Sequence, residues 1–335
     1  MNTASRGRFG HIDALKGAGI LLVVFGHLIE KPSGQSVLLQ TLYTGIYSFH
    51  MPLFVFLSGI FAHETLSSRD YRKIVWTLFF PLVIFQLVYL AAGHVTGWYS
   101  YSPFTPYWLL WFIASLICWR LLLPLFASPV GLTAAILGAI FVGYDDAVGY
   151  ALSSARTIYF LPFFVLGHLY GRALVTLARR HRLAFSCLFL FSMLAVTAWW
   201  LNGLDGSALT GSRDYGSAPP FPAYPGLGRL LVLSLSLSGV LGFCALIPNR
   251  SALLAWFGER SLPIYLLHGL AVMVLISAGA ADQIPQPLLL PALLGMTVLV
   301  ATTAARFDGP MRRLFAPPAD NFDMIELISG WRRSR

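Results

Sequence analysis

The sequence predicts an all-α, polytopic integral membrane protein: one bundle of about ten transmembrane helices with the N- and C-termini in the cytoplasm. Three observations predict this fold class. Of the 335 residues, 57% are hydrophobic and only 11% are charged, whereas roughly 25% are charged in an average soluble protein. The mean hydropathy is +0.70. The apolar residues form long runs bounded by Pro, Gly or charge, which excludes a soluble enzyme and leaves no room for a large extramembrane domain.

Ten apolar runs make up the expected bundle. Each is expected to be a helix, because a helix satisfies its own backbone hydrogen bonds within lipid. The runs lie near residues 12–30, 46–65, 74–96, 106–124, 129–144, 157–173, 184–201, 228–248, 261–279 and 287–306. The first run contains Lys16 and lacks a small-residue cleavage site behind it, so we expect a retained helix and not a removable signal peptide. The prediction is one domain over 1–335, with a helical core over about 12–306 and a cytoplasmic tail over about 307–335.

The basic residues set the orientation. A cytoplasmic N-terminus puts 19 of the 23 Lys and Arg residues on the inner side. The four on the outer side are Lys31, Arg156, Arg213 and Arg229. This asymmetry agrees with the positive-inside rule for an even number of spans. The net charge of +9 is therefore mainly a topology signal, with phosphate or acidic-lipid binding as a secondary use, and nucleic acid is not an expected partner.

The first run contains an unusual set of ionisable residues: Asp13, Lys16, His27 and Glu30. Such residues are costly inside a membrane and are functional candidates for that reason. At about 100° per residue they share an arc of about 100° and form one polar stripe. Lys16 and His27 are eleven residues apart, which is three turns and about 16 Å along the axis. The stripe predicts a hydrophilic channel that is open to the cytoplasm near Lys16 and closed near His27.

The second run adds an imidazole at a similar depth, since the first two helices run in opposite directions. Its sequence is YSFHMPLFVFLSG, in which Met51 and Pro52 are expected to begin the helix, because proline is tolerated in a first turn. His50 is then either a partner that converges on His27 or an interfacial residue bonded to a loop carbonyl. The sequence leaves both interpretations open.

Three cations, Arg69, Arg72 and Lys73, gather in the first inner loop. At a helix entrance such a cluster can bind phosphate, Arg through bidentate hydrogen bonds and Lys as a point charge. The same cluster is also what the positive-inside rule produces. Phosphate binding and topology are therefore equally supported by this feature.

Later runs contain further candidates. Arg156 begins the sixth run on the outer side, and Tyr159 follows it. His268 lies about two turns into the ninth run, as a site residue or as a hydrogen-bonded packing residue. Trp111 in the fourth run either contacts a ligand or belongs to the aromatic belt.

The three cysteines, Cys118, Cys187 and Cys244, each lie inside an apolar run. Their spacing is not typical of a disulfide framework or a metal site, so we expect small packing residues and no metal.

Several strings occur together in a specific order. A basic residue and a His with ten residues between them are Lys16 and His27, FHMPLF occupies 49–54 and Ser-Gly occupies 58–59. An Arg-x-x-Arg follows at Arg69 and Arg72. Later strings are YWLLWFIASL at 107–116, YFLPFFVLGHLYGR at 159–172 and GERSLPIYLLH at 258–268. Together they resemble the membrane-bound acyltransferase-3 family, in particular its branch similar to fucose 4-O-acetylases.

The resemblance implies a membrane O-acyltransferase of a bacterial-type inner membrane. It would move an acyl group, usually acetyl, from cytoplasmic coenzyme A to a hydroxyl of an extracytoplasmic or lipid-linked glycan. The expected donor is acetyl-CoA, whose pantetheine arm matches the separation of Lys16 and His27. Succinyl as the acyl group, a covalent intermediate and the oligomeric state stay open.

The same resemblance gives roles to the candidate residues. His27 is the expected general base, and His50 the group that stabilises the oxyanion or positions the acceptor. Glu30 is either the partner that fixes the tautomer of His27 or, given the three-residue spacing, a residue that faces the outer vestibule. The expected donor-binding residues are Lys16, Arg69, Arg72 and Lys73. The expected acceptor-binding residues are Asp13, Trp111, Arg156, Tyr159 and His268.

The alternative is a ten-helix secondary transporter or exporter of a small anionic or sugar-like solute. Transporters commonly contain two repeated halves. Here Arg156 and His168 match Lys16 and His27 only loosely, since they are twelve positions apart in the sequence and about 120° apart around a helix. The FHMP string also has no counterpart in the second half.

Overall fold

The computed structural model describes residues 3–98, 105–149 and 151–317, with side chains from residue 10 onward except that of residue 35. Within these ranges the chain is helical and contains no strand. The α-helices are α1 Thr3–Ile29, α2 Val37–Ile60, α3 Ser68–Ile74, α4 Phe80–Thr96, α5 Trp111–Phe126, α6 Pro129–Phe141, α7 Ser154–Arg180, α8 Arg182–Leu201, α9 Ser207–Thr210, α10 Pro225–Leu246, α11 Ala252–Glu259, α12 Ser261–Ser277, α13 Gln286–Ala305 and α14 Asp308–Leu314. The predicted tail lies partly in α14, and its residues 318–335 are outside the described residues.

Each of the ten predicted runs overlaps a helix, but fewer helices qualify as spans. In the described residues, seven helices are long and apolar enough to cross a membrane, and an eighth qualifies if α11 and α12, which meet at 76°, form one broken span. α2 is not among these helices, and the shorter apolar segment Pro129–Tyr144 falls below the length required of a span. The all-helical membrane class is therefore supported, while ten spans and cytoplasmic termini remain predictions.

The expected start of the second helix was wrong. α2 begins at Val37 and continues through Pro52 to Ile60. Gln40, Thr44 and Ser48 lower the hydropathy of its first half without breaking the helix. Pro52 removes one backbone donor, and the Ser48 hydroxyl donates to the Gly45 carbonyl at 2.7 Å in the turn before it.

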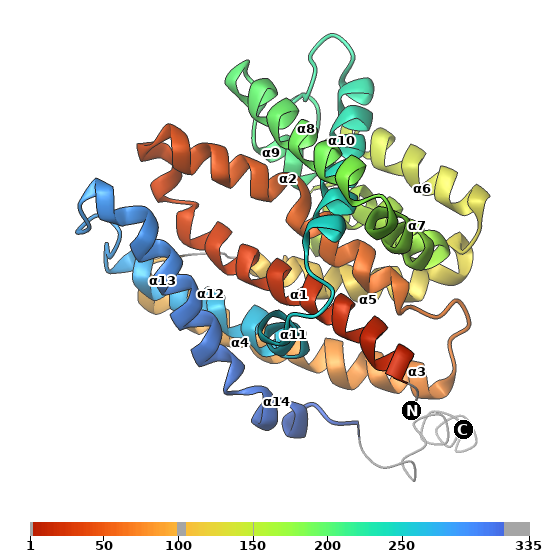
Figure 1. Cartoon of the computed structure of the whole chain (residues 1–335), viewed down its shortest axis with the longest axis horizontal. Coiled ribbons are helices and arrows are strands. Elements are labelled where there is room, and N and C mark those ends of the chain that lie inside the picture. Colours follow the sequence, from red (N-terminus) through yellow and green to blue (C-terminus); the bar gives the residue numbers. More distant parts are fainter. Residues whose placement is uncertain (1–2, 99–104, 150, 318–335) are drawn as a thin grey trace.

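Three helices cross the middle of the bundle (Figure 1): α1, α2 and α5. α1 packs against α2, α11, α12 and α13, and α12 packs against α4. On the other side α2 packs against α7, α8 and α10, while α5 packs against α6 and α7. The central helices are therefore enclosed by neighbours from both halves of the chain.

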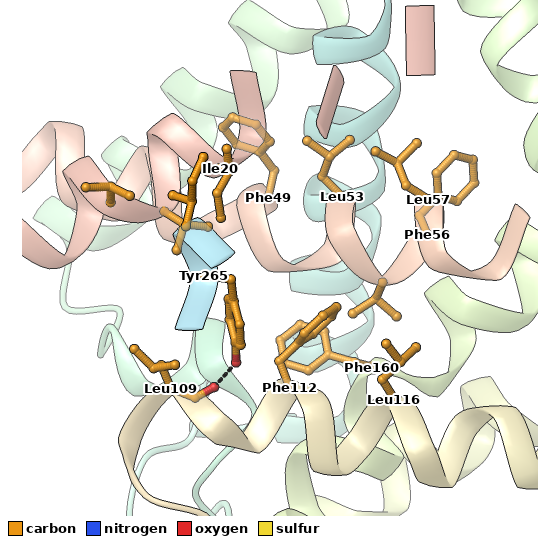
Figure 2. Packing of buried hydrophobic residues seen from close by; sticks show 14 of the residues in the cluster. Ile20, Phe49, Leu53, Phe56, Leu57, Leu109, Phe112, Leu116, Phe160 and Tyr265 are labelled. Atoms are coloured by element: carbon orange, nitrogen blue, oxygen red, sulfur yellow. Dashed lines mark hydrogen bonds between the residues drawn. The ribbon is translucent and has the colours of Figure 1, made fainter. Parts of the chain in front are cut away.

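Buried polar groups tie α5 to its neighbours. The Trp119 indole donates to the Thr157 carbonyl of α7 at 2.7 Å, and the Ser115 and Thr157 hydroxyls are 2.7 Å apart. The Tyr265 hydroxyl of α12 donates to the Leu109 carbonyl beside the apolar cluster shown in Figure 2. Each bond satisfies a group that would be costly to bury alone. α5 is thereby fixed in depth relative to α7 and α12.

α1 and α11 meet at a pair of glycines. A Cβ atom added at Gly17 would lie 1.8 Å from the Leu254 carbonyl oxygen, and one at Gly258 would lie 1.8 Å from that of Asp13. The two backbones are therefore in contact, which only glycine permits. This crossing sets the position of Lys16, the residue next to Gly17.

The long segment between α8 and α10 is anchored from inside. The Tyr215 N–H donates to the Gly143 carbonyl at 2.6 Å, and its hydroxyl donates to Ile140 at 2.8 Å. The buried Arg229 guanidinium lies 4.5 Å from the Tyr215 ring centre. Burial raises the pKa of Tyr215 to about 12, so its phenol remains the donor that the carbonyl of Ile140 needs.

Candidate active site

One face of α1 lines two cavities in succession. Lys16, Ile20 and Val23 line an inner cavity, and His27 and Glu30 line an outer one. The spacings of four, three, four and three residues keep all five on one helix face. The uninterrupted helix Thr3–Ile29 therefore connects the two cavities along a single edge.

His27 is part of a three-residue hydrogen-bond network. Its Nδ1 atom is 3.2 Å from Oε2 of Glu30 and 3.2 Å from the hydroxyl of Tyr47 on α2, and that hydroxyl donates to Glu30 Oε2 at 3.3 Å. A carboxylate only accepts hydrogen bonds, so the network favours the proton of neutral His27 on Nδ1. Nε2 then keeps its lone pair, which is the form that a general base requires.

Glu30 stays ionised in this network. Partial burial opposes its charge, but hydrogen bonds from His27 and Tyr47 place the pKa of Glu30 below its usual value. Its side chain is 42% exposed, while that of His27 is 13% exposed. The carboxylate thus lies at the open end of the network and the imidazole lies deeper.

Aromatic rings hold the His27 imidazole. The Trp108 ring centre lies 4.7 Å from that of His27 at 66°, and the ring centre of His268 lies 5.4 Å away on α12. Trp108 has a φ angle of +40°, a left-handed backbone conformation that is energetically unfavourable for a residue with a large side chain. Strained residues of this kind cluster at functional sites, and here the conformation belongs to a residue whose ring lies against the imidazole.

The outer cavity has a volume of about 140 Å³ and an aromatic lining. Besides His27, Glu30 and Tyr47, its walls include His50, Met51, Trp108, Trp111, Arg156 and Phe160. The Arg156 guanidinium lies 5.1 Å from the Trp111 ring centre, and Trp111 stacks on Phe160 at 5.3 Å. Apolar walls with a few polar groups are typical of small-molecule sites.

His50 lines the outer cavity together with His27. Its Nδ1 atom is 2.7 Å from the Ile46 carbonyl oxygen, an atom that can only accept. The proton of the neutral ring is therefore on Nδ1, and Nε2 is an acceptor. Of the two roles expected for His50, this geometry favours positioning an acceptor hydroxyl over donating to an oxyanion.

The inner cavity has a volume of about 270 Å³ and lies between α1, α2, α5 and α12. Lys16 lines it and pairs with Asp13 at 3.3 Å, and the Lys16 ammonium is 4.9 Å from the Phe61 ring centre. The remaining walls are mostly hydrocarbon, including Ile20, Val23 and Phe54. The expected continuous polar stripe is thus wrong: two polar pairs, Asp13–Lys16 and His27–Glu30, are separated by an apolar stretch.

Other expected site residues lie outside both cavities. Arg69, Arg72 and Lys73 are on the short helix α3 and line neither cavity, although Leu78, further along the same continuous segment, lines the inner one. Tyr159 is buried against Arg229, whose guanidinium is 5.3 Å from the Tyr159 ring centre. His268 is fully buried behind His27, and its Nδ1 atom is 3.0 Å from the Ile264 carbonyl oxygen.

Tyr47, Met51 and Arg120 are among the cavity residues that the sequence analysis did not assign to the site. Arg120 had a detectable signal, since it is a charge inside an apolar run, but it was counted only toward topology. Tyr47 and Met51 had no such signal because both are common in apolar helices. In the described part of the chain, no three His, Cys, Asp or Glu side chains are grouped so that they could hold a metal ion.

The fold and the site define a multi-pass membrane protein with a half-buried imidazole–carboxylate pair between an inner and an outer cavity. The acyltransferase domain family matches residues 9–306, and the chain therefore belongs to the acyltransferase-3 family. Nodulation protein NolL of Sinorhizobium fredii (strain NBRC 101917 / NGR234) is 30% identical over 200 residues. That stretch covers 52% of this chain and 53% of the relative, about half of each. No solved structure matches the chain.

Proposed function

We propose that the protein is a membrane O-acyltransferase that moves a small acyl group from acyl-CoA to a hydroxyl of a glycan or glycolipid. The observation that supports this most directly is the hydrogen-bonded His27–Glu30 pair, which lines the outer cavity, while Lys16 on the same helix lines the inner one. An imidazole with a fixed tautomer is a suitable base for a hydroxyl nucleophile. Family membership supports the reaction class.

In the proposed reaction, His27 Nε2 takes the proton of the acceptor hydroxyl as the hydroxyl oxygen bonds to the thioester carbon. The carbon–sulfur bond then breaks, and the imidazolium returns the proton to the thiolate of coenzyme A. Glu30 keeps the Nδ1–H oriented and stabilises the transient imidazolium. His50 Nε2 accepts a hydrogen bond from the sugar that receives the acyl group. The positive charge of Arg156 stabilises the oxyanion that develops on the thioester carbonyl.

The donor is proposed to approach from the cytoplasm, where Lys16, Arg69, Arg72 and Lys73 favour its phosphates. The outer cavity of about 140 Å³ suits a short acyl group such as acetyl. Asp13 holds Lys16 through their ion pair, which makes it a positioning residue in this proposal. The membrane is proposed to be a bacterial-type inner membrane.

The acceptor is proposed to be an extracytoplasmic or lipid-linked sugar, as in the fucose 4-O-acetylase-like branch that the motifs resemble. Trp111 and Phe160 offer ring faces for the apolar side of a sugar, and Arg156 and His50 offer polar contacts. This division puts donor and acceptor on opposite sides of His27.

The test is acyl transfer by the purified protein in lipid nanodiscs, with radiolabelled acetyl-CoA and a model glycan. We expect release of free coenzyme A, and His27→Ala should reduce it by about 10²–10⁴-fold, the usual contribution of a general base. His94→Ala, a change at an exposed histidine of α4, is the matched control and should stay within about twofold. Wild-type protein that releases no coenzyme A, or release that is insensitive to His27→Ala, would contradict the proposal.

A further inference from the structure

A second cation lines the inner cavity besides Lys16. Arg120 lines this cavity from α5, while Lys16 lines it from α1. Arg120 follows Trp111, an outer-cavity residue, by nine positions, and Lys16 precedes His27 by eleven. At 1.5 Å per residue these separations are about 13 Å and about 16 Å along the two helix axes. The two cations therefore lie at similar distances from the outer cavity, on two different helices.

The two cations differ in their partners. Lys16 has the Asp13 carboxylate at 3.3 Å. Among the residues that the structure describes, Arg120 has no hydrogen-bond acceptor and no carboxylate within 4.0 Å, and its buried Nε is without a partner. The charge of Asp70 acts on Arg120 without direct contact, and this carboxylate accepts hydrogen bonds from the Ser67 hydroxyl and N–H at 2.6 and 3.0 Å.

A guanidinium with no bonded carboxylate is expensive beside hydrocarbon, and Phe112, Ile113 and Leu116 line the same cavity on α5. Arginine nevertheless retains its charge under such conditions, because its side chain is not deprotonated in proteins. Lys16 and Arg120 both line the cavity, and its described lining includes no carboxylate, since Asp13 and Asp70 lie outside that lining. A lining with two cations favours an anion as the occupant of the cavity.

We propose that Arg120, together with Lys16, binds the diphosphate of the acyl-CoA donor; this rests on the function proposed above. A guanidinium fork matches phosphate oxygens in a bidentate arrangement. The hydrocarbon wall beyond the cations suits the methyl-bearing pantetheine arm. From phosphorus to sulfur that arm has about 13 bonds, roughly 16 Å when extended, which matches the axial distance from Lys16 to His27.

A phosphate can also come from a lipid headgroup, so the test has to separate the two sources. Wild-type protein, Arg120→Gln and Arg120→Lys are compared in nanodiscs of phosphatidylcholine alone and with phosphatidylglycerol. Two donors are used, acetyl-CoA and S-acetylpantetheine, which has the same arm and thioester but no phosphate. Arg313→Gln, at an exposed arginine of α14, is the matched control.

For Arg120→Gln we expect the KM for acetyl-CoA to rise about 10- to 100-fold, as for loss of a charge-assisted hydrogen bond. The kcat and KM for S-acetylpantetheine should stay within about twofold of the wild-type values, because that donor has no phosphate for Arg120 to bind. Arg120→Lys should recover part of the loss. These effects should be the same in both lipid mixtures.

Other results overturn the proposal. An equal loss with both donors indicates that Arg120 only supports the fold, and an effect that appears only with phosphatidylglycerol assigns the cation to lipid. If wild-type protein uses neither donor, the proposed function fails, and the diphosphate site is then judged by thermal unfolding. In that case coenzyme A, but not pantetheine, should raise the Tm of wild-type protein and not that of Arg120→Gln; equal shifts in both proteins reject the site.

Discussion

His27 Nδ1 and Glu30 Oε2 are 3.2 Å apart, and the two residues lie three positions apart at the C-terminal end of α1. The helix ends at Ile29, so Glu30 is the first residue that can turn back toward the imidazole. The proposed base and its proposed orienting carboxylate are therefore part of one continuous segment. The pair does not depend on the packing of two helices to reach hydrogen-bond distance.

Glu30→Gln should reduce turnover with little change in the KM for the donor. The amide removes the negative charge that stabilises the His27 imidazolium, and its NH₂ group can face Nδ1 and reverse the tautomer. We expect a loss of about 10²-fold in kcat, measured by coenzyme A release in nanodiscs. Glu64→Gln, a change at an exposed carboxylate, is the control. A kcat that is unchanged in Glu30→Gln would show that Glu30 does not orient the base.

The acid dependence of stability should identify the same pair. The folded pKa of Glu30 lies below its usual value, so its ionised form stabilises the fold above the unfolded pKa of about 4.3. This contribution is lost as the pH falls through the lowered folded pKa. We expect the Tm difference between wild-type protein and Glu30→Gln to shrink as the pH falls below about 4.5. A difference that grows below this pH would mean that the folded pKa of Glu30 is raised instead.

Met51 lines both cavities, and this predicts control over the acyl group that reaches His27. Its unbranched thioether chain can move aside for a small group. Met51→Phe should reduce acetyl transfer about tenfold while coenzyme A binding is retained, because Lys16 and Arg120 of the inner cavity are unchanged. Met51→Ala should raise the butyryl-to-acetyl ratio by about tenfold, the usual effect of one or two methylenes in an apolar pocket.

The matched control for Met51 is Met296→Ala, a partly buried methionine of α13 that lines neither cavity. It should leave the butyryl-to-acetyl ratio unchanged. Competition between acetyl-CoA and butyryl-CoA in one reaction gives the ratio directly. If Met51→Ala and Met51→Phe both leave it unchanged, the acyl group does not pass this side chain.

Much of the site could be predicted from α1 alone, because helical periodicity fixes which residues share a face. Lys16 and His27 are on one face, as predicted, and His50 shares the outer cavity with His27. Hydropathy located the helices for a similar reason, since lipid requires long apolar runs. It failed at α2, where polar residues delayed the expected start to Met51 while the helix begins at Val37.

The remaining features depend on packing between helices that are distant in sequence. Arg120 lines the same cavity as Lys16 only because α5 and α1 both contribute to its walls. His268 is removed from the outer cavity because α12 places it behind His27. Tyr159 faces Arg229 of α10 and not the cavity that Phe160, its neighbour, lines. Periodicity within one helix contains no information on these contacts.

The glycine contact between α1 and α11 leads to a stability prediction, and a second glycine on α1 provides a control for which the opposite change in stability is expected. A methyl group at Gly17 would overlap the Leu254 carbonyl oxygen at 1.8 Å, and that oxygen is backbone, so one helix must move. Gly17→Ala should lower the free energy of unfolding by about 3 kcal/mol or more, the upper end of the range typical of overpacking. It should also weaken coenzyme A binding, because Lys16 moves with the helix.

Gly10→Ala is the control, since a methyl group there meets nothing within 4 Å. Alanine in place of glycine within a helix stabilises by roughly 0.5–1 kcal/mol, so Gly10→Ala should leave the Tm equal or slightly higher. Thermal unfolding in detergent, followed by tryptophan fluorescence, compares the two variants with wild-type protein. Because both substitutions make the same chemical change on α1, opposite signs isolate the contact with α11. A Gly17→Ala protein as stable as Gly10→Ala would mean that the two backbones do not touch at Gly17.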